Sequence, residues 1–477
     1  AQSTAGTSPD YDRWAATASI AQNTLESGAA NEAFLTKLRE KLALRRADFV
    51  AAQDASTVRL NTLKTQLSAL GPVPEEGSEP EDIASRRTTL KSEIETLNAP
   101  RIRAKEAFER AEGLIREIDA ALSAQQAAIL MRLGPSPLDV RIWPSAMGQL
   151  TEALQVVIGS VSAAWNTPVV REEIRDNLPV ILSLLLAAGL LMTQGRRWMV
   201  HVSLTFNRAE SPYANKFASY LRSLGQLAIV ILSLHLLARA WDISRLHGND
   251  LAFLLEHAVW ILAPFFGSRW MGKQLFPLDG LTQIPVPLQA DLRPQARLIT
   301  HWLGLIVSVQ VFMGYLRDAV DFNNGTIAVY SFILVLIASV ATFRLGMMIW
   351  KSTAGAADDQ SIAKSTNRLI TRLGQAIVVG SVISLVLAVV GYSDAADALL
   401  FSSLFSAGLL AVLFVTFESV RDLCGMLASD EASGHDGLTA VVINAALILM
   451  SLPVFALIWG ARVSQLTELW TQFKTGV

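Results

Sequence analysis

From Leu178 onward the chain alternates long apolar runs with short polar loops, and this pattern limits the folds it can adopt. A membrane-spanning helix needs about 20 mostly apolar residues, within a range of roughly 17–25. Inside a bilayer the backbone polar groups of such a run can pair only within the helix, so the pattern predicts a helical membrane domain over residues 173–465. The eight predicted spans are 178–192, 224–240, 251–266, 298–315, 326–347, 369–391, 398–417 and 438–459.

The segment before these spans has a different composition, rich in Ala, Glu, Arg and Gln, and we expect a separate helical domain over residues 9–145. Its apolar residues recur at steps of three, four or seven, which predicts narrow apolar seams on helices joined as a coiled-coil hairpin. We interpret the charged residues between them, such as Arg39 and Arg46, as a solvated face. The predicted seam comprises Leu35, Leu38, Leu42, Phe49, Leu63, Leu67, Leu70, Ile83, Leu90, Ile94, Leu97, Ala104, Phe108, Ala111, Ile115, Ile118, Leu122 and Ile129. The fold class is therefore all-α.

Three shorter segments complete the predicted organisation. Residues 1–8 are expected to be a flexible N-terminus and residues 466–477 a tail outside the cytoplasm. Residues 146–172 form an amphipathic linker with an apolar stripe at Met147, Leu150, Leu154, Val157 and Ile158. That stripe fits a helix lying on the membrane surface, and it fits a third packing helix equally well.

Basic residues in the loops predict the orientation, because cytoplasmic loops of membrane proteins carry an excess of Lys and Arg. With the N-terminus outside, fifteen basic residues fall on the inner side and five on the outer side. The inner set is Arg196, Arg197, Arg208, Lys216, Arg222, Arg269, Lys273, Arg293, Arg297, Arg344, Lys351, Lys364, Arg368, Arg372 and Arg421, and the outer set is Arg239, Arg245, Arg317, Arg462 and Lys474. The chain opens Ala1-Gln2-Ser3, which fits removal of a signal peptide, and a trimmed chain would look the same. These features predict a bacterial inner-membrane protein with its first domain and its C-terminus in the periplasm.

The motifs of catalysis, phosphate binding and metal binding are missing from the sequence, so we expect neither an enzyme nor a cofactor or metal site. The net charge of −2 predicts no nucleic-acid partner. Ionisable residues inside spans are costly and are therefore functional candidates. His235 in the second predicted span and Glu256 with His257 in the third are expected to pair between neighbouring helices. Interface anchors are expected at Arg196, Arg197, Trp198, Arg269, Trp270, Lys273, Arg344, Trp350 and Lys351.

Four stretches resemble the periplasmic domain that precedes the large MscS-type mechanosensitive channels of proteobacteria. They are Tyr11-Asp12-Arg13-Trp14, residues 66–74 (QLSALGPVP), residues 111–119 (AEGLIREID) and residues 133–138 (LGPSPL) ahead of Trp143. The general layout of the whole chain is also similar to that family. The resemblance implies extra N-terminal spans around a pore of seven subunits, which membrane tension opens to release ions and small osmolytes in osmotic stress.

The resemblance also implies a C-terminal core of about three more spans and a cytosolic β-rich domain, neither of which residues 1–477 contain. The full protein is then either longer than this chain or a relative that lacks the core, and no pore residue of the family maps onto this sequence. The expected partners are membrane lipids and further copies of the chain. Two alternatives remain open, a secondary transporter and a membrane-anchored scaffold of the cell envelope.

Overall fold

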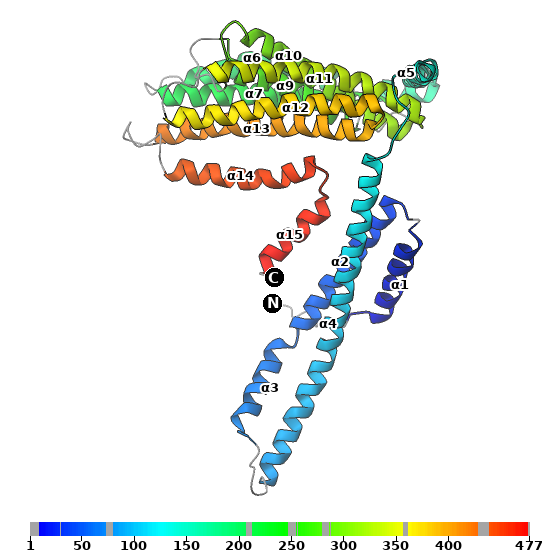
Figure 1. Ribbon diagram of the computed structural model, residues 1–477, viewed down its shortest axis with the longest axis vertical. Helices are drawn as coiled ribbons and strands as arrows, with labels where there is room; N and C mark the ends of the chain where they lie inside the picture. Colours follow the sequence, from blue (N-terminus) through cyan, green and yellow to red (C-terminus); the bar gives the residue numbers. More distant parts are fainter. Residues whose placement is uncertain are drawn as a thin grey trace. The chain divides into compact units, whose positions relative to one another are not determined.

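Helices are the only regular elements in the part of the chain that the computed structural model describes (Figure 1). It divides into two compact units, Ala1–Ile129 and Leu130–Val477. The prediction of an all-α fold with a polytopic apolar domain is confirmed. The predicted flexible residues 1–8 lie outside the described residues. The structure describes residues 9–28, 30–72, 80–206, 212–246, 254, 256–278, 286, 288–355, 361–427 and 438–475.

The first unit consists of four helices whose ends are set by local capping. Asp10 caps the first helix by accepting a hydrogen bond from the backbone N–H of Arg13 at 3.0 Å, and Asn31 caps the second in the same way. Gly28 ends the first helix in the left-handed conformation, with φ of 62°. The helices are α1 (Tyr11–Ser27), α2 (Glu32–Asp54), α3 (Thr57–Ala69) and α4 (Glu81–Leu130).

The core of the first unit lies where α1, α2 and α4 meet. Trp14 of α1 packs edge-on against Phe49 of α2, with ring centroids 5.1 Å apart. Most of the predicted seam is buried or half-buried, but Ile83 and Ile129 are exposed, because they lie near the two ends of α4, beyond the helices packed against it. The seam residues in this core are Leu35, Leu38, Leu42, Phe49, Ala111, Ile115, Ile118 and Leu122.

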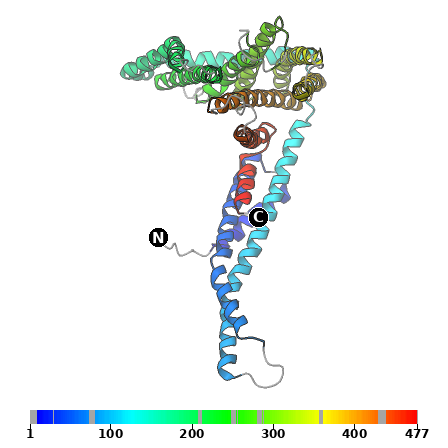
Figure 2. The ribbon, with the colours of Figure 1, turned by 90° about the vertical axis from the view of Figure 1, so that its left-hand side faces the viewer.

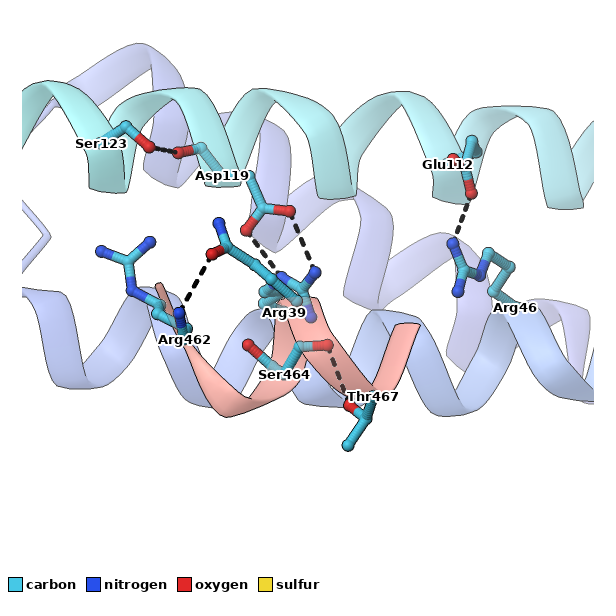
Figure 3. A network of polar contacts seen from close by, with 9 residues as sticks. Arg39, Arg46, Glu112, Asp119, Ser123, Arg462, Ser464 and Thr467 are labelled. Carbon is cyan, nitrogen blue, oxygen red and sulfur yellow. Dashed lines mark hydrogen bonds and ion pairs between the residues drawn. The ribbon is translucent and has the colours of Figure 1, made fainter. Parts of the chain in front are cut away.

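Two ion pairs join α2 to α4, so the interpretation of their arginines as a solvated face was wrong (Figure 3). Both oxygens of the Asp119 carboxylate accept hydrogen bonds from Arg39, at 2.7 and 3.0 Å, and Arg39 is only 2% exposed. Arg46 binds Glu112 at 2.5 Å. The aliphatic stems of the arginines line the helix interface while their guanidinium groups reach the carboxylates, which a periodicity argument cannot show.

The second unit contains the membrane helices and two helices of a different kind, α5 and α15. Consecutive long helices pack side by side, and the short links between them make neighbours antiparallel (Figure 1). The predicted tail from residue 466 is part of α15, which begins after Gly460 turns the chain with φ of 91°. The elements are η1 (Val140–Ile142), α5 (Trp143–Asn166), α6 (Pro168–Phe206), α7 (Pro212–Ser244), α9 (Ala258–Leu275), α10 (Arg293–Ala319), α11 (Asn324–Gly355), α12 (Ser361–Val390), α13 (Ser393–Leu427), α14 (Leu438–Ile458) and α15 (Val463–Thr475).

Seven of the described helices are long and apolar enough to cross a membrane, compared with the eight predicted spans. The difference falls on the predicted span 251–266, which lies partly outside the described residues. From Ala258 onward it belongs to α9, which continues past that range through Arg269 and Lys273, and these cations lower the hydropathy of α9. The seven candidates are Pro168–Gly195, Tyr213–Ser244, Arg293–Arg317, Asn324–Ser352, Arg368–Val390, Ser393–Met426 and Thr439–Ile458.

The membrane helices differ sharply in how much of their surface other helices cover. In α11, 56% of the most apolar stretch is buried inside the unit, against 11% in α6 and α7 and 6% in α14. The bundle therefore has a centre at α11, packed by α10, α12 and α13, and a periphery of largely uncovered apolar helices. The central cluster consists of Leu303, Ile306, Val307, Val335, Ala338, Ala388, Ala396, Leu400 and Phe401.

Candidate functional site

The segment between α4 and α5 is a short connector, residues 131–142, which its sequence keeps out of a continuous helix. Pro135 and Pro137 provide no backbone N–H, and each disfavours helical conformation in the residue before it. The indole Nε1 of Trp143 donates a hydrogen bond to the carbonyl of Pro137 at 2.8 Å. Asp139 caps the short helix η1 by accepting from the N–H of Arg141 at 3.0 Å. The connector thus has a defined conformation of its own.

The connector is hydrogen-bonded to the turn between α12 and α13. The N–H of Gly134 donates to the carbonyl of Gly391 at 3.0 Å, and the hydroxyl of Ser136 donates to the carbonyl of Val389 at 2.9 Å. The last carbonyls of a helix have no partner within it, so the connector satisfies groups that α12 leaves open. Gly391 has φ of 113°, and a Cβ atom there would lie 2.7 Å from the carbonyl oxygen of Gly134. The close approach of the two backbones requires glycine.

An ion-pair cluster reinforces this contact. Asp394, in the first turn of α13, lies 3.4 Å from a guanidinium nitrogen of Arg132 in the connector and 3.6 Å from one of Arg317 near the end of α10. A carboxylate near a helix N-terminus is also favoured by the helix dipole. Both arginines are about half exposed, so each pair contributes modestly to stability, but together they link the connector to two membrane helices.

One turn further into α13, the carboxylate of Asp397 joins three membrane helices. It accepts a hydrogen bond from Ser331 of α11 at 2.7 Å and one from Gln310 of α10 at 3.2 Å. Asp397 was not among the predicted functional residues, because the seventh span was predicted to begin at Ala398. Asp394 and Asp397, spaced i and i+3 at the start of an apolar run, were a usable signal, since ionisable groups inside a span are costly unless they have partners.

Helix α5 packs across the end of the membrane bundle where the connector is bound (Figures 1 and 2). Its Gln149 accepts hydrogen bonds from the backbone N–H of Asn323 at 3.2 Å and from the hydroxyl of Thr326 at 2.6 Å, at the beginning of α11. Helix α5 therefore belongs to the same unit as the membrane helices. We call the connector, the α12–α13 turn and these contacts of Asp394, Asp397 and Gln149 the junction.

The polar residues predicted to pair inside the membrane, His235, Glu256 and His257, are not part of the junction. His235 and Glu256 are exposed, and the ring of His257 packs against Tyr315 of α10 with centroids 4.3 Å apart. The pairing of His235 with Glu256 and His257 stays a prediction, and the described contact of His257 joins the start of α9 to α10.

The predicted interface anchors occupy the second halves of α6, α9 and α11. Trp198 is 55% exposed, and Arg344 is exposed and donates to Gln295 at 3.3 Å. Trp270 differs from the expectation, because it is buried and its Nε1 donates to the hydroxyl of Ser223 on α7 at 3.2 Å. Of the remaining anchors, Arg197, Arg269 and Lys351 are exposed, Lys273 and Trp350 are half-buried, and the side chain of Arg196 lies outside the described residues.

A comparison with protein families matches residues 101–158 to a family described as a protein of unknown function (DUF3772). Searches of curated proteins and of solved structures found no match. The matched segment runs from the second half of α4 through the connector into α5, and it includes Gly134, Ser136 and Gln149. The match therefore includes the connector and Gln149, which form one side of the junction. Among the described residues, no group of three or more His, Cys, Asp or Glu side chains could hold a metal ion.

Replacing Asp397 by leucine is expected to lower the free energy of unfolding of the membrane unit by roughly 2 kcal/mol, because the hydroxyl of Ser331 and the amide of Gln310 lose their acceptor. Asp397→Asn, which keeps one acceptor oxygen, should have a smaller effect. The measurement is thermal denaturation of the purified full chain in detergent, followed by the loss of its size-exclusion peak. Glu418→Leu, toward the other end of α13, is the control, because Glu418 is 40% exposed and pairs with Arg421 of the same helix at 3.5 Å. Equal losses in both leucine variants would contradict a specific role for Asp397.

Proposed function

We propose that this chain is the periplasmic and membrane-tension-sensing part of an MscS-type channel that releases ions and small osmolytes on hypoosmotic shock. The observation that carries the proposal is the small fraction of α6, α7 and α14 that other helices cover, 6–11% of their most apolar stretches. Tension favours the state with the larger area in the membrane plane. Helices that meet lipid over most of their surface can shift position in response without breaking a tightly packed core.

The junction supports the same proposal, because it joins the connector to α13, against which α7 and α14 pack. The α12–α13 turn binds the connector through two backbone carbonyls, and Arg132 adds an ion pair to Asp394. A displacement of α12 or α13 would therefore move the connector, which continues directly into α4. The resemblance of the segments around Tyr11, Gly71 and Gly134 to the periplasmic domain of that channel family points to the same function.

The proposed orientation places the first unit in the periplasm of a bacterium, with the spans in the inner membrane. In the antiparallel arrangement, the C-terminal ends of α6, α9, α11 and α13 lie at the end of the bundle opposite the connector. The second parts of these helices and the beginnings of α7, α10 and α12 carry fourteen of the fifteen basic residues of the predicted inner side, and Arg208 lies outside the described residues. An excess of basic residues is typical of the cytoplasmic side. The resemblance further implies a homo-oligomer of seven copies, with lipid as the other partner.

The test is patch-clamp recording under suction on bacterial spheroplasts that lack their other mechanosensitive channels. Cells expressing the full reading frame that encodes this chain are expected to show pressure-activated currents, and cells expressing residues 1–477 alone are expected to show none. Membrane insertion of both products is checked by immunoblotting of membrane fractions. Stable insertion of both without any current from the full reading frame would contradict the channel proposal.

A secondary transporter is the second candidate, and the observation in its favour is Asp397, which is held by Ser331 and Gln310 within a candidate span. Transporters use such groups to couple ion movement to substrate movement. This candidate predicts that Asp397→Asn abolishes ion-coupled uptake into vesicles. The channel proposal predicts that the same variant keeps its tension-activated current.

A further inference from the structure

Helix α5 has a covered stripe along its whole length and an open face beside it. Ala146, Ala153 and Ala164 are buried on the covered stripe. On the open face, large apolar side chains are uncovered, with Ile158 61% and Trp165 56% exposed. An amphipathic helix with an open apolar face beside membrane spans is typical of a helix lying in the interface.

The open face of α5 forms one wall of an apolar groove of about 520 Å³, within the volume range of small-molecule sites. Val157, Val161 and Trp165 line it from α5, and Leu246, just beyond the end of α7, closes the other side. The lining is almost entirely apolar. It therefore fits a hydrocarbon chain and offers little to a polar solute.

The position of the groove sets its depth in the membrane. The candidate span of α6 begins at Pro168, two residues after Asn166 at the groove's end, and Leu246 follows the last residue of the α7 span, Ser244. Helix α5 lies across the same end of the bundle in both views (Figures 1 and 2). The first turns of α6 carry Arg171, Glu172 and Glu173, and charged residues at a span end belong among the lipid headgroups, so the groove lies at headgroup level.

Two arginines lie beside the groove. A guanidinium nitrogen of Arg171 donates to the carbonyl of Asn166, a groove residue, at 3.2 Å. Arg245 adjoins Leu246, and its guanidinium lies 3.3 Å from the carboxylate of Glu173. Arginine is suited to phosphate, which it binds through charge-assisted hydrogen bonds. Apolar lining and adjacent guanidinium groups match the two halves of a phospholipid.

We propose that the groove between α5 and Leu246 is a phospholipid site, with an acyl chain along Val157, Val161 and Trp165 and the phosphate beside Arg171. The site holds an individual lipid, in contrast to the general contact that the exposed faces of the spans make with the bilayer. This proposal does not depend on the channel function, because lipid would occupy the groove in any protein with this membrane unit.

The experiment uses the full chain in vesicles containing a phosphatidylglycerol probe with a photoreactive diazirine on its acyl chain. After irradiation, peptides are mapped by mass spectrometry. Adducts are expected to concentrate on residues 157–165 and at Leu246, at several times the yield on Leu154, which is exposed on the same helix outside the groove lining. Even labelling of all exposed apolar residues, or none on α5, would overturn the proposal.

A matched pair of variants separates the groove from the rest of α5. Val157→Trp places an indole in the groove and is expected to reduce its labelling at least fivefold, whereas Val156→Trp, at the neighbouring exposed position, should leave the labelling unchanged. Arg171→Gln should reduce labelling by the anionic probe more than labelling by a phosphatidylcholine probe. Unchanged membrane insertion and size-exclusion behaviour confirm that each variant folds. Equal effects of the two tryptophan variants would refute the site.

Discussion

Gly391→Ala is expected to lower the free energy of unfolding of the membrane unit by roughly 3 kcal/mol, by detaching the connector from the α12–α13 turn. The backbone there has φ of 113°, a region that residues with a Cβ atom rarely adopt, and that strain alone costs about 1–3 kcal/mol. The added Cβ would also lie 2.7 Å from the carbonyl oxygen of Gly134, so the hydrogen bond between the two glycines would be lost.

The measurement is thermal denaturation of the full chain in detergent, combined with hydrogen–deuterium exchange of residues 131–142. Gly380→Ala is the matched control, since it lies in the same helix with open space around its Cβ position and should be neutral or slightly stabilising. In Gly391→Ala, the amide of Gly134 should exchange faster. Unchanged exchange there, or an equal loss of stability in the control, would show that the junction does not depend on this close approach.

If the channel proposal is correct, Gly391→Ala should also shift the pressure threshold of the full reading frame, because the turn would no longer hold the connector. Gly380→Ala should leave that threshold unchanged. The stability effect and the gating effect are separate results. A stability loss without any threshold shift would leave the junction as a structural joint and would count against its role in sensing.

Arg39→Met is expected to destabilise the first unit by roughly 3 kcal/mol, the lower end of the range for removing one partner of a buried ion pair. Asp119 keeps 24% of its side chain exposed, so water compensates part of the loss. The readout is faster hydrogen–deuterium exchange in peptides from α2 and from residues 107–122 of α4. Replacing both partners, as in Arg39→Met with Asp119→Leu, should recover part of the stability, because no unpaired charge remains.

Arg45→Met is the control for the buried pair. Arg45 lies in the same helix and pairs with Asp48 at 3.7 Å on the surface, so its replacement should change stability by about 0.5 kcal/mol or less. Similar exchange rates in the Arg39 and Arg45 variants would contradict a special contribution from the Arg39–Asp119 pair. A double replacement as unstable as Arg39→Met alone would show that packing of the arginine stem, and not its charge, holds α2 to α4.

Periodicity predicted the parts of the structure that depend on local sequence. The spacing of Leu35, Leu38 and Leu42 places them on one face of any helix, so their burial in the first unit followed from the pattern. Long apolar runs predicted the spans in the same way. The helices extend beyond most predicted spans, because polar residues at the ends of a run continue the same backbone hydrogen bonding.

The tertiary structure alone decided the contacts between distant segments. Ser136 and Val389 are 253 residues apart, and no periodicity connects the proline-rich connector to the end of α12. The partners of Asp397 come from two other helices. From the sequence, Arg39 and Arg46 are expected to face solvent, and only the packing of α4 against α2 pairs them with carboxylates. The sequence by itself therefore determined which residues are helical and which faces are apolar, since both depend on near neighbours along the chain. Which helix ends and charges meet depends on packing between segments, and this is how the junction and the groove arise.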